Sequence, residues 1–442
     1  MLCQSRYSLP RTARPSRLIS LLVLAALLSC SDPPIEPPPP AGTASLQQTA
    51  ATFTTVDVRV IATGFDGHLA LRVVIDDTLR IVGFSLPCDT TITIANLLPS
   101  TAYRANVQVM DDSEITFTGD VVLLRTKDTL STDYELIGLE CGVDMGNLDD
   151  ALYLSRDDVW ATGEFKAWSD TAGKYIDYNA AHYDGNVVTY HRIPFYLYFF
   201  GKELYQDYYP ITRIHYFEGK VWFFASTGAT VYHDGALECL RFGKAENGPG
   251  AVASTWSDVS GLYVGCYDGK IRHFSGSSFD IFADTQDQKI ISLYGADDTL
   301  YALSSLRLPD SYGTVYRISS GACVKMEAMK PPRGAIGMWI SQEGRIHIGG
   351  PGPHYWDGEQ WVRMGMPVNY YFDALSGAGE DRIFMANTRS QVAHFNGYRW
   401  NLVPGTETYT GIFYNLDAGS DGFCAVGRTR KNVPIMLIGR HK

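Results

Sequence analysis

The sequence has few charged residues, and its lysines and arginines do not form runs. Charged side chains make up 19% of the 442 residues, and 37 basic residues against 48 acidic ones give a formal net charge of −11. A protein that binds a nucleic-acid backbone concentrates positive charge on one surface. The charge balance therefore argues against a nucleic-acid partner.

Recognisable catalytic and metal-binding motifs are also missing. The chain has no G-x-S-x-G, H-E-x-x-H, P-loop or EF-hand pattern, and no S-x-D-x-G-x-T-W box. None of its eight cysteines forms a C-x-x-C pair or the Cys/His spacing of a zinc site. We therefore expect no cofactor and no bound metal, and we expect most cysteines to be small buried apolar residues.

Long hydrophobic runs are rare. The run from Leu18 to Leu28 follows four arginines and is too short to span a bilayer as a mature helix, which is typical of a signal peptide. No later stretch approaches 18 apolar residues, so the sequence predicts no membrane-spanning helix. Any attachment to a membrane would then depend on a lipid.

The apolar run ends in the residues LLSC, the last of which is Cys30. This order resembles the lipobox of bacterial lipoproteins, in which the cysteine is acylated and becomes the new N-terminus. The resemblance implies that residues 1–29 are removed and that Cys30 is the lipid attachment site. Because Ser31 rather than aspartate follows, it also implies the outer membrane, on its periplasmic or surface side. The alternative is an ordinary secretory signal in which Cys30 is incidental.

Proline is concentrated directly after this cysteine. Six of the 21 prolines lie between residues 33 and 40. Such a composition favours a stiff, extended polyproline segment. We interpret residues 30–45 as a lipidated tether that holds the folded part away from the bilayer.

Residues 46–127 alternate apolar and polar side chains in short runs, which is typical of half-buried β-strands. The run from Leu97 to Tyr103, LLPSTAY, resembles the L-x-P-x-T-x-Y segment of fibronectin type III domains. The resemblance implies a β-sandwich in which the tyrosine hydroxyl bonds back to the corner backbone. The core tryptophan of that family is absent, because every tryptophan lies at or beyond residue 160, and no Arg-Gly-Asp occurs. We therefore expect a spacer rather than an adhesive domain.

Residues 128–442 contain an internal repeat. Seven short apolar strands each follow a two-residue turn, at intervals of 62, 41, 38, 46, 37 and 40 residues. This period is typical of four-stranded propeller blades. The equivalent positions are Trp160, Trp222, Tyr263, Tyr301, His347, Phe384 and Cys424. Six repeats continue to a second tight turn that ends in glycine, a strong hairpin signal.

The seventh repeat lacks its fourth strand, since only one strand-like run follows Cys424. Residues 133–140, DYELIGLE, precede the first repeat and have a strand pattern. The sequence thus predicts an all-β chain: a fibronectin type III-like sandwich followed by a seven-bladed β-propeller closed by N-terminal strand exchange. Closure would leave no free edge strand.

The sequences of the repeats, for example VWFFASTGATVYHDG, resemble those of propellers in bacterial sensor ectodomains. The order of lipobox, tether, fibronectin-like domain and propeller resembles a group of largely uncharacterised bacterial lipoproteins. Both resemblances imply a fold much more than a chemistry. Sensor relatives continue into a membrane helix and a signalling domain, whereas this sequence stops after its last repeat, so direct signalling is not expected.

Histidines recur just before the glycine turn, at positions 182, 273 and 394. Equivalent side chains of successive blades point in radially different directions, so they do not converge on one ion. We interpret these histidines as structural.

Three connections are longer than their counterparts. From the second strand to the glycine turn there are 25 residues in repeat one and 20 in repeat four, against 11–13 in four others, and the segment after repeat one is also enlarged. In a propeller these connections emerge on one face. Residues 195–210 alone hold eight aromatic side chains. The candidate ligand- or partner-binding residues of these insertions are Trp168, Tyr175, Tyr178, Phe195, Tyr196, Tyr198, Phe199, Phe200, Tyr205, Tyr208, Tyr209, Arg307 and Tyr312.

Exposed aromatic clusters bind sugars or protein partners, although these rings could instead pack together as a satellite core. We expect a monomeric, lipid-anchored, non-enzymatic binding or scaffold protein that engages a glycan or an envelope protein. One alternative is a carbohydrate-active enzyme, which needs two carboxyl groups close together; a carboxyl pair at the floor of the channel on this face would favour it. Another is an accessory ligand sensor. The carboxylates available in the insertions are Asp170, Asp177, Glu203 and Asp207.

Overall fold

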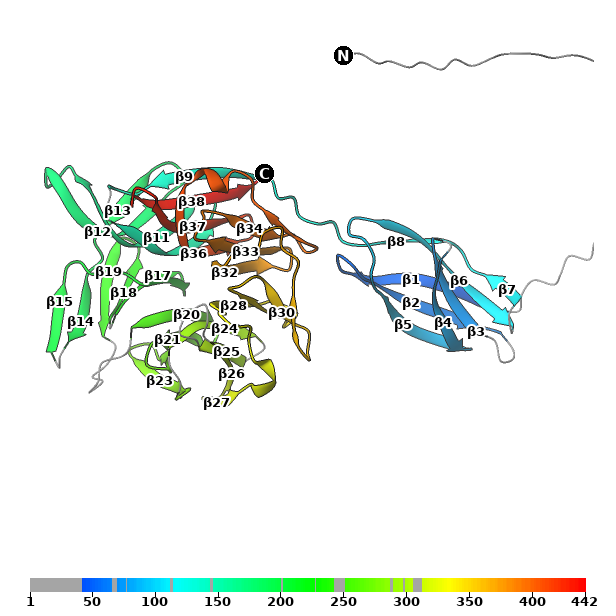
Figure 1. Ribbon diagram of the computed structural model, residues 1–442. Coiled ribbons are helices and arrows are strands. Elements are labelled where there is room, and N and C mark those ends of the chain that lie inside the picture. Colours follow the sequence, from blue (N-terminus) through cyan, green and yellow to red (C-terminus); the bar gives the residue numbers. More distant parts are fainter. Residues whose placement is uncertain are drawn as a thin grey trace, which may run out of the picture. The chain divides into compact units, whose positions relative to one another are not determined.

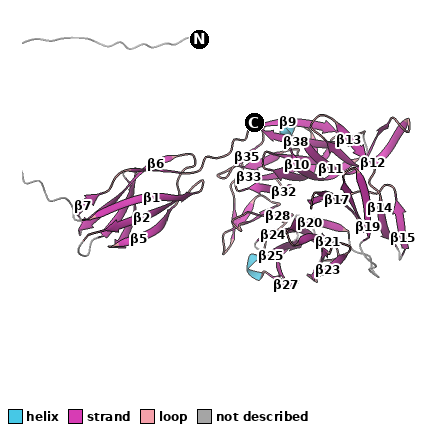
Figure 2. Cartoon of the chain, turned by 180° about the vertical axis from the view of Figure 1, so that it is seen from behind, coloured by secondary structure: helices cyan, strands magenta, loops and turns pink. Residues whose placement is uncertain are grey.

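The structure is a computed structural model, and it is all-β, as the sequence predicts (Figures 1 and 2). The signal peptide, Cys30 and nearly all of the tether lie outside the described residues. Within the described part, no helix has the length and hydropathy to cross a membrane. The chain divides into two compact units, so we describe the sheets one at a time. The structure describes residues 42–442 except 66–69, 77, 112–113, 144–145, 200–201, 227, 242–250, 287–288, 297–298 and 305–311.

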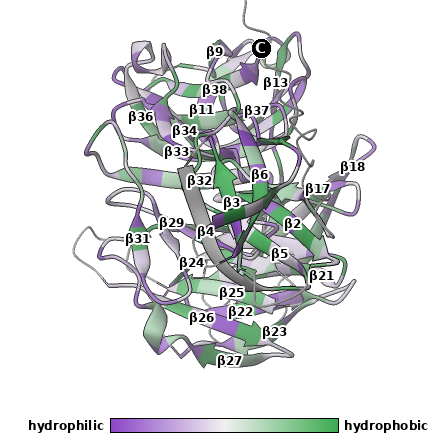
Figure 3. Cartoon of the chain, turned by 90° about the vertical axis from the view of Figure 1, so that its right-hand side faces the viewer, coloured by the Kyte–Doolittle hydropathy of each residue, from purple (hydrophilic) through white to green (hydrophobic). Residues whose placement is uncertain are grey.

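Two sheets form from the N-terminal segment. One has the order β1-β2-β5, and the other has the order β4-β3-β6-β7, with β8 paired to β6. Buried and accessible residues alternate along the strands, for example in β2, where Val56, Val58 and Val60 are buried, and Figure 3 shows apolar residues in green along β2 and β3. The strands are β1(Thr43–Ala51), β2(Val56–Thr63), β3(Ala70–Ile75), β4(Thr78–Ser85), β5(Cys88–Ile94), β6(Ala102–Asp111), β7(Glu114–Thr118) and β8(Val122–Arg125).

A tyrosine fixes the corner between β5 and β6. The backbone N–H of Leu98 donates a hydrogen bond to the Tyr103 hydroxyl oxygen over 2.6 Å. The Thr126 hydroxyl donates to the carbonyl oxygen of Leu98 over 2.7 Å. The LLPSTAY segment therefore has the side-chain-to-backbone bond that its resemblance implies.

Residues 134–442 form seven four-stranded antiparallel sheets. In six of them the strands follow one another in sequence. These sheets are β10(Asn147–Ser155), β11(Asp158–Ser169), β12(Lys174–Tyr183) and β13(Val188–His191); β16(Arg213–Phe217), β17(Lys220–Ala225), β18(Gly228–His233) and β19(Ala236–Arg241); β20(Val252–Asp258), β21(Gly261–Cys266), β22(Lys270–Phe274) and β23(Phe279–Asp284); β24(Ile290–Ala296), β25(Thr299–Ser304), β26(Thr314–Ser319) and β27(Ala322–Lys325); β28(Gly337–Ile340), β29(Ile346–Gly349), β30(His354–Trp356) and β31(Trp361–Arg363); and β32(Phe372–Gly379), β33(Arg382–Asn387), β34(Val392–Phe395) and β35(Trp400–Leu402).

The seventh sheet combines the two ends of this region. Its order is β36(Gly411–Gly419), β37(Gly422–Thr429), β38(Pro434–His441) and β9(Tyr134–Glu140). Backbone pairing runs from Ile435 opposite Glu140 to His441 opposite Tyr134. Figure 1 shows β9 in cyan beside β38 in red. The segment that the sequence assigns to the missing strand is thus the partner of β38.

The glycine turns have the backbone conformation that their sequence demands. In all six, the glycine has a φ between +78° and +109°, a region that other residues rarely adopt. In the turn of the first sheet, the Asp184 carboxylate also accepts a hydrogen bond from the backbone N–H of Val187 over 2.9 Å. The Asx-Gly pairs of the sequence therefore form tight turns between the third and fourth strands.

Each repeated histidine ties its strand to the turn between the first two strands of the same sheet. The Nε2 atom of His182 lies 2.9 Å from the Asp158 carboxylate, and the Nε2 atoms of His273 and His394 lie 3.1 Å and 2.7 Å from backbone carbonyl oxygens of such turns. The His182 ring also stacks on Trp160, with ring centroids 4.2 Å apart. These contacts are internal to each sheet.

Buried side chains from neighbouring sheets form the core. One cluster joins Leu152 and Trp160 of the first sheet to Ile214 and Phe223 of the second. The six cysteines within the described residues are free thiols, and three of them are buried. Burial raises the pKa of the Cys141 thiol to about 12, as expected for a small apolar core residue.

Candidate functional site

The β11–β12 hairpin carries the most accessible aromatic residues of the first insertion. Strand β13 pairs only with the inner part of β12, from Ala180 to Tyr183, so the outer half of the hairpin extends beyond the sheet. There Trp168 and Tyr175 are paired across the hairpin, with ring centroids 5.4 Å apart. They are 53% and 54% exposed. We refer to these two residues as the hairpin aromatic pair.

The tryptophan of this pair is fixed in place. Its indole Nε1–H donates a hydrogen bond to the Asp170 carboxylate over 3.0 Å. A ring that is both exposed and held in one orientation loses little conformational freedom when a ligand stacks on it. Tyr178, by contrast, packs on Phe165 and Tyr190 and belongs to the margin of the core.

Residues 195–210 form a separate two-stranded sheet, β14(Phe195–Phe199) and β15(Lys202–Gln206). Phe195 is fully buried in the cluster of Trp160 and Phe223, so it belongs to the core and is not available to a ligand. Tyr205 is exposed and contacts Tyr196, with ring centroids 5.4 Å apart. The side chains of Tyr198 and Phe199, and all of Phe200, lie outside what the structure describes.

A buried asparagine holds the base of this insertion. The side-chain amide of Asn179 donates to the carbonyl oxygens of Ile193 and Tyr209 over 2.8 Å and 2.9 Å. Its oxygen accepts a hydrogen bond from the Ile193 N–H over 2.7 Å. The two ends of the insertion are therefore fixed to one side chain of β12.

Tyr208 lies beside charged groups at the same base. The Arg192 guanidinium lies over its ring at 5.5 Å from the centroid, and it forms an ion pair with Asp207 over 3.0 Å. Burial, followed by the negative charge of Glu164, raises the pKa of Tyr208 well above its ordinary value. Tyr208 and Tyr209 thus pack at the insertion's base rather than on its exposed side.

The insertion in repeat four is only partly described. Tyr312 is exposed, and the ammonium of Lys330 lies 4.4 Å from its ring centroid. Arg333 lies over the same ring at 5.6 Å. Arg307 falls outside the described residues.

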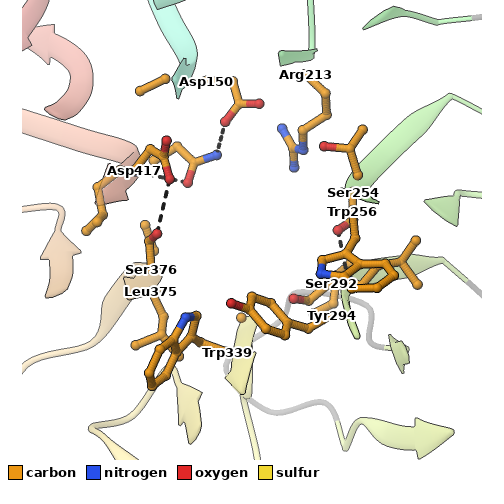
Figure 4. A pocket seen from close by; sticks show the side chains of 18 of the residues that line it. Asp150, Arg213, Ser254, Trp256, Ser292, Tyr294, Trp339, Leu375, Ser376 and Asp417 are labelled. Carbon is orange, nitrogen blue, oxygen red and sulfur yellow. Dashed lines mark hydrogen bonds between the residues drawn. The ribbon is translucent and has the colours of Figure 1, made fainter. Parts of the chain in front are cut away.

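A central pocket of about 300 Å³ is lined by the first strand of every one of the seven sheets. These strands are β10, β16, β20, β24, β28, β32 and β36. No motif in the sequence indicates this pocket, because each strand contributes only a few side chains to it. We refer to it as the central pocket (Figure 4).

One side of the central pocket carries two buried carboxyl groups. Asp150 accepts hydrogen bonds from the Ile214 N–H over 2.9 Å and from the side-chain amide of Asn415. Asp417 accepts from the Tyr153 N–H over 2.9 Å and from the Ser376 hydroxyl over 3.2 Å.

Burial governs the ionisation of both carboxyl groups. It raises the pKa of Asp150 to about 6; the nearby Arg213 guanidinium opposes this shift and the Asp417 charge adds to it. Burial raises the pKa of Asp417 as well. Three carboxyl groups, those of Asp150, Asp373 and Asp417, therefore line the pocket together with the Arg213 guanidinium.

The other side of the central pocket is aromatic. Trp256, Tyr294 and Trp339 come from β20, β24 and β28. The rings of Tyr294 and Trp339 are nearly perpendicular, with centroids 6.3 Å apart. Figure 4 shows these two rings across the pocket from Asp150 and Asp417.

Several polar residues of the pocket also connect neighbouring first strands. Asp150 bonds to β16 and Asp417 to β10, while Ser254 accepts from the Leu293 N–H of β24 over 2.8 Å. Ser292 accepts from the Met338 N–H of β28 over 3.1 Å. Asp150, Ser254 and Ser292 each directly follow a β-bulge-like register shift. A polar residue within an otherwise apolar first strand was therefore the sequence signal for the pocket.

A second pocket of about 350 Å³ adjoins the central pocket and shares Arg213, Asp373 and Asn415 with it. Tyr267, Tyr371 and Tyr414 are among its other lining residues. It lies where the first strands begin, and we refer to it as the mouth pocket. Because the start of β10 pairs with the outer part of β11, the mouth pocket and the hairpin aromatic pair lie at the same end of the sheets.

The carboxylates of the insertions are engaged elsewhere. Asp170 accepts from Trp168, Asp177 pairs with Lys166 over 3.6 Å, and Asp207 pairs with Arg192. The side chain of Glu203 is outside the described set. The carboxyl groups that line the central pocket together are those of Asp150, Asp373 and Asp417.

No protein-family model matches the sequence, and no curated protein matches it. The solved structures that the chain is similar to in fold include the following two. The WD40 β-propeller domain of Doa1 aligns with a TM-score of 0.49 and 10% identity over 71% of this chain and 98% of its own. The computationally designed Ika8 protein aligns with a TM-score of 0.43 and 10% identity over 69% of this chain and 100% of its own.

Proposed function

We propose that the seven four-stranded sheets are the blades of a seven-bladed propeller that β9 closes, and that the two N-terminal sheets form a fibronectin type III-like sandwich. The lining of one pocket by all seven first strands supports the first part. The pairing of β9 with β38 supports closure. The bond of Tyr103 to Leu98 supports the sandwich.

Within this fold, we propose a lipid-anchored, non-enzymatic glycan-binding protein of the bacterial envelope. The observation that carries the proposal is the division of the central pocket into a carboxylate side and an aromatic side. The C–H face of a sugar ring stacks on aromatic rings, while its hydroxyl groups donate to carboxylates and accept from guanidinium groups. A volume of about 300 Å³ is at the lower end of the range for small-molecule sites, which suits one or two sugar residues.

The hairpin aromatic pair extends this site. Trp168 and Tyr175 lie at the same end of the sheets as the mouth pocket. A longer glycan could place one residue in the central pocket and stack another on the pair. Such rigid exposed aromatic rings carry much of the binding energy where they occur.

A glycan array probed with the full-length chain tests the proposal. The test variant is Asp417→Asn, which keeps the shape of the side chain and both of its hydrogen-bonding partners, because its oxygen can accept from Tyr153 and its amide can donate to Ser376. We expect the wild type to bind a defined set of glycans and the variant to bind them at least about tenfold more weakly, since a charge-assisted hydrogen bond is lost.

The control is Asp280→Asn, an exposed acid on β23 that is not among the pocket residues. It should bind like the wild type. A wild-type protein that binds no glycan above background, or an Asp417→Asn variant with unchanged affinity and melting temperature, contradicts the proposal.

The second candidate is a glycosidase, and Asp150 and Asp417 favour it specifically. Two carboxyl groups with separate environments can act as acid and base. If the protein is an enzyme, glycans incubated with it release new reducing ends, and Asp417→Asn abolishes the release. Intact recovery of a bound glycan points instead to the binding function.

A further inference from the structure

A third pocket, with a different chemistry, shares no lining residue with the central pocket or the mouth pocket. Its volume is about 440 Å³. It is bounded by the turn between β33 and β34, the segment before β36, and the turn between β37 and β38. Among its lining side chains are Arg389, Arg428, Arg430 and one acid, Glu407. We refer to it as the arginine pocket.

The three guanidinium groups have no counter-ion within the described part of the chain. No ion pair joins Arg389, Arg428 or Arg430 to a carboxylate there. Arg389 and Arg430 are exposed, and Arg428 is partly buried. Three cations against one acid stand out in a protein whose formal net charge is −11. A locally positive pocket on an acidic protein concentrates small anions.

Neighbouring groups hold this cluster in position. The Arg389 guanidinium lies 4.2 Å from the ring centroid of Tyr370, and that of Arg428 lies 5.8 Å from the ring centroid of Tyr414. The backbone N–H of Arg430 donates to the Thr410 carbonyl oxygen over 2.9 Å. The guanidinium groups of Arg389 and Arg428 and the backbone of Arg430 are therefore held in place before any ligand arrives, which lowers the entropic cost of binding.

Hydroxyl groups add further donors. Thr388, Thr410 and Thr429 line the same pocket. The Thr429 oxygen accepts a hydrogen bond from the Val433 N–H over 3.2 Å, so its hydroxyl hydrogen can be donated to a ligand. Guanidinium N–H groups and hydroxyl groups are the hydrogen-bond donors that a multiply charged oxyanion accepts from. The pocket has both kinds of donor.

We propose that the arginine pocket binds one phosphate or sulfate group. Guanidinium groups match the oxygens of such a group two at a time, and the pocket offers three of them, two from different turns and one, Arg428, from strand β37. The acidic character of the rest of the chain repels an extended polyanion, so the ligand is a single compact group, either a free ion or an ester. The proposal does not depend on glycan binding in the central pocket.

Isothermal titration calorimetry on the full-length chain tests this site, with inorganic phosphate, sulfate and glucose 6-phosphate as three separate probes. We expect saturable binding of the oxyanions. The Arg389→Ala/Arg430→Ala variant should bind them at least about tenfold more weakly, because two charge-assisted contacts are lost. Both residues are exposed, so the melting temperature should hardly change.

The matched control is Lys431→Ala, which removes one exposed positive charge from the same turn but not from the lining of the pocket. It should bind the probes within about twofold of the wild type. If glucose 6-phosphate binds more tightly than inorganic phosphate, the phosphate group is carried by a larger ligand. If the two affinities are equal, the ligand is the free ion. Both outcomes support the site. Absence of saturable binding, or an equal loss in Lys431→Ala and the arginine variant, overturns it.

Discussion

One buried histidine of this protein keeps two polar ring atoms in an apolar environment. His347 in β29 is 2% exposed, and within the described part of the chain neither of its ring nitrogens has a hydrogen-bond partner. It occupies the repeat position that holds Trp160, Trp222 and Phe384 in other sheets. Burial, and after it the charge of Arg345, lowers the pKa of His347 to about 3.

This histidine should make the fold sensitive to acid. The unfolded chain takes up a proton at an ordinary histidine pKa near 6.5, whereas the folded chain resists it until about pH 3. Stability is therefore lost as the pH falls below about 6.5. His347→Phe should remove this loss, with a gain over the wild type of about 3 kcal/mol at pH 4 and a smaller gain at pH 7.

Denaturant unfolding of both proteins between pH 4 and pH 7 measures the difference. His233→Gln serves as a control, because His233 is exposed on β18. A gap between wild type and His347→Phe that does not widen in acid would contradict the assignment.

Asn179 gives a second prediction for a single side chain. Asn179→Ala should leave the carbonyl groups of Ile193 and Tyr209 without their hydrogen bonds. Each unsatisfied buried group costs about 1–3 kcal/mol. We expect hydrogen exchange to accelerate in residues 193–210 while the rest of the chain stays protected. Unchanged protection of this insertion would show that other contacts hold it; Asn401→Ala, at an accessible position, is the control.

At the scale of strands, β9 is the element on which the seventh sheet depends. Tyr134 is buried among Phe384, Phe413 and Phe423. Deletion of residues 133–140 removes this ring and leaves β38 with an unpaired edge. We expect a lower melting temperature and concentration-dependent association, because exposed edges pair with other chains.

Size-exclusion chromatography over a range of concentrations reports the association. Tyr134→Ala separates the two effects, since it should cost about 3–5 kcal/mol while keeping the backbone pairing. A deletion variant that stays monomeric with an unchanged melting temperature would rule out this role of β9.

The strands were largely predictable, and the pockets were not. The period of the apolar runs places second strands at Trp160 and Trp222, and the DYELIGLE segment coincides with β9. In contrast, the inward or outward direction of rings in residues 195–210 depends on the pairing of β14 with β15, so composition could not separate buried Phe195 from exposed Tyr205. The central pocket depends on register shifts in the first strands, and the local sequence signal for each shift is a single polar residue, as at Asp150, Ser254 and Ser292.

At the scale of the whole molecule, we predict that a lipid on Cys30 attaches the protein to the membrane. Cys30 lies outside the described residues, so only an experiment on the full chain addresses it. Metabolic labelling with a fatty-acid analogue should mark the wild type and fail in Cys30→Ser, which should leave the membrane fraction. Continued labelling of the variant would mean that Cys30 is not the acylated residue.

The pairing of β9 with β38 also affects folding during synthesis, because the two strands are made far apart in time. Lys442 contacts Asp133, which is 309 residues earlier in the chain, so β9 is synthesised long before its partner exists. At about 5–20 residues per second, the wait lasts on the order of 15 to 60 seconds. During that interval a strand with exposed backbone groups depends on chaperones or on its own charged residues to avoid pairing wrongly. The pairing of β38 with β9 therefore ends the period in which β9 is open to proteolysis and to wrong pairing.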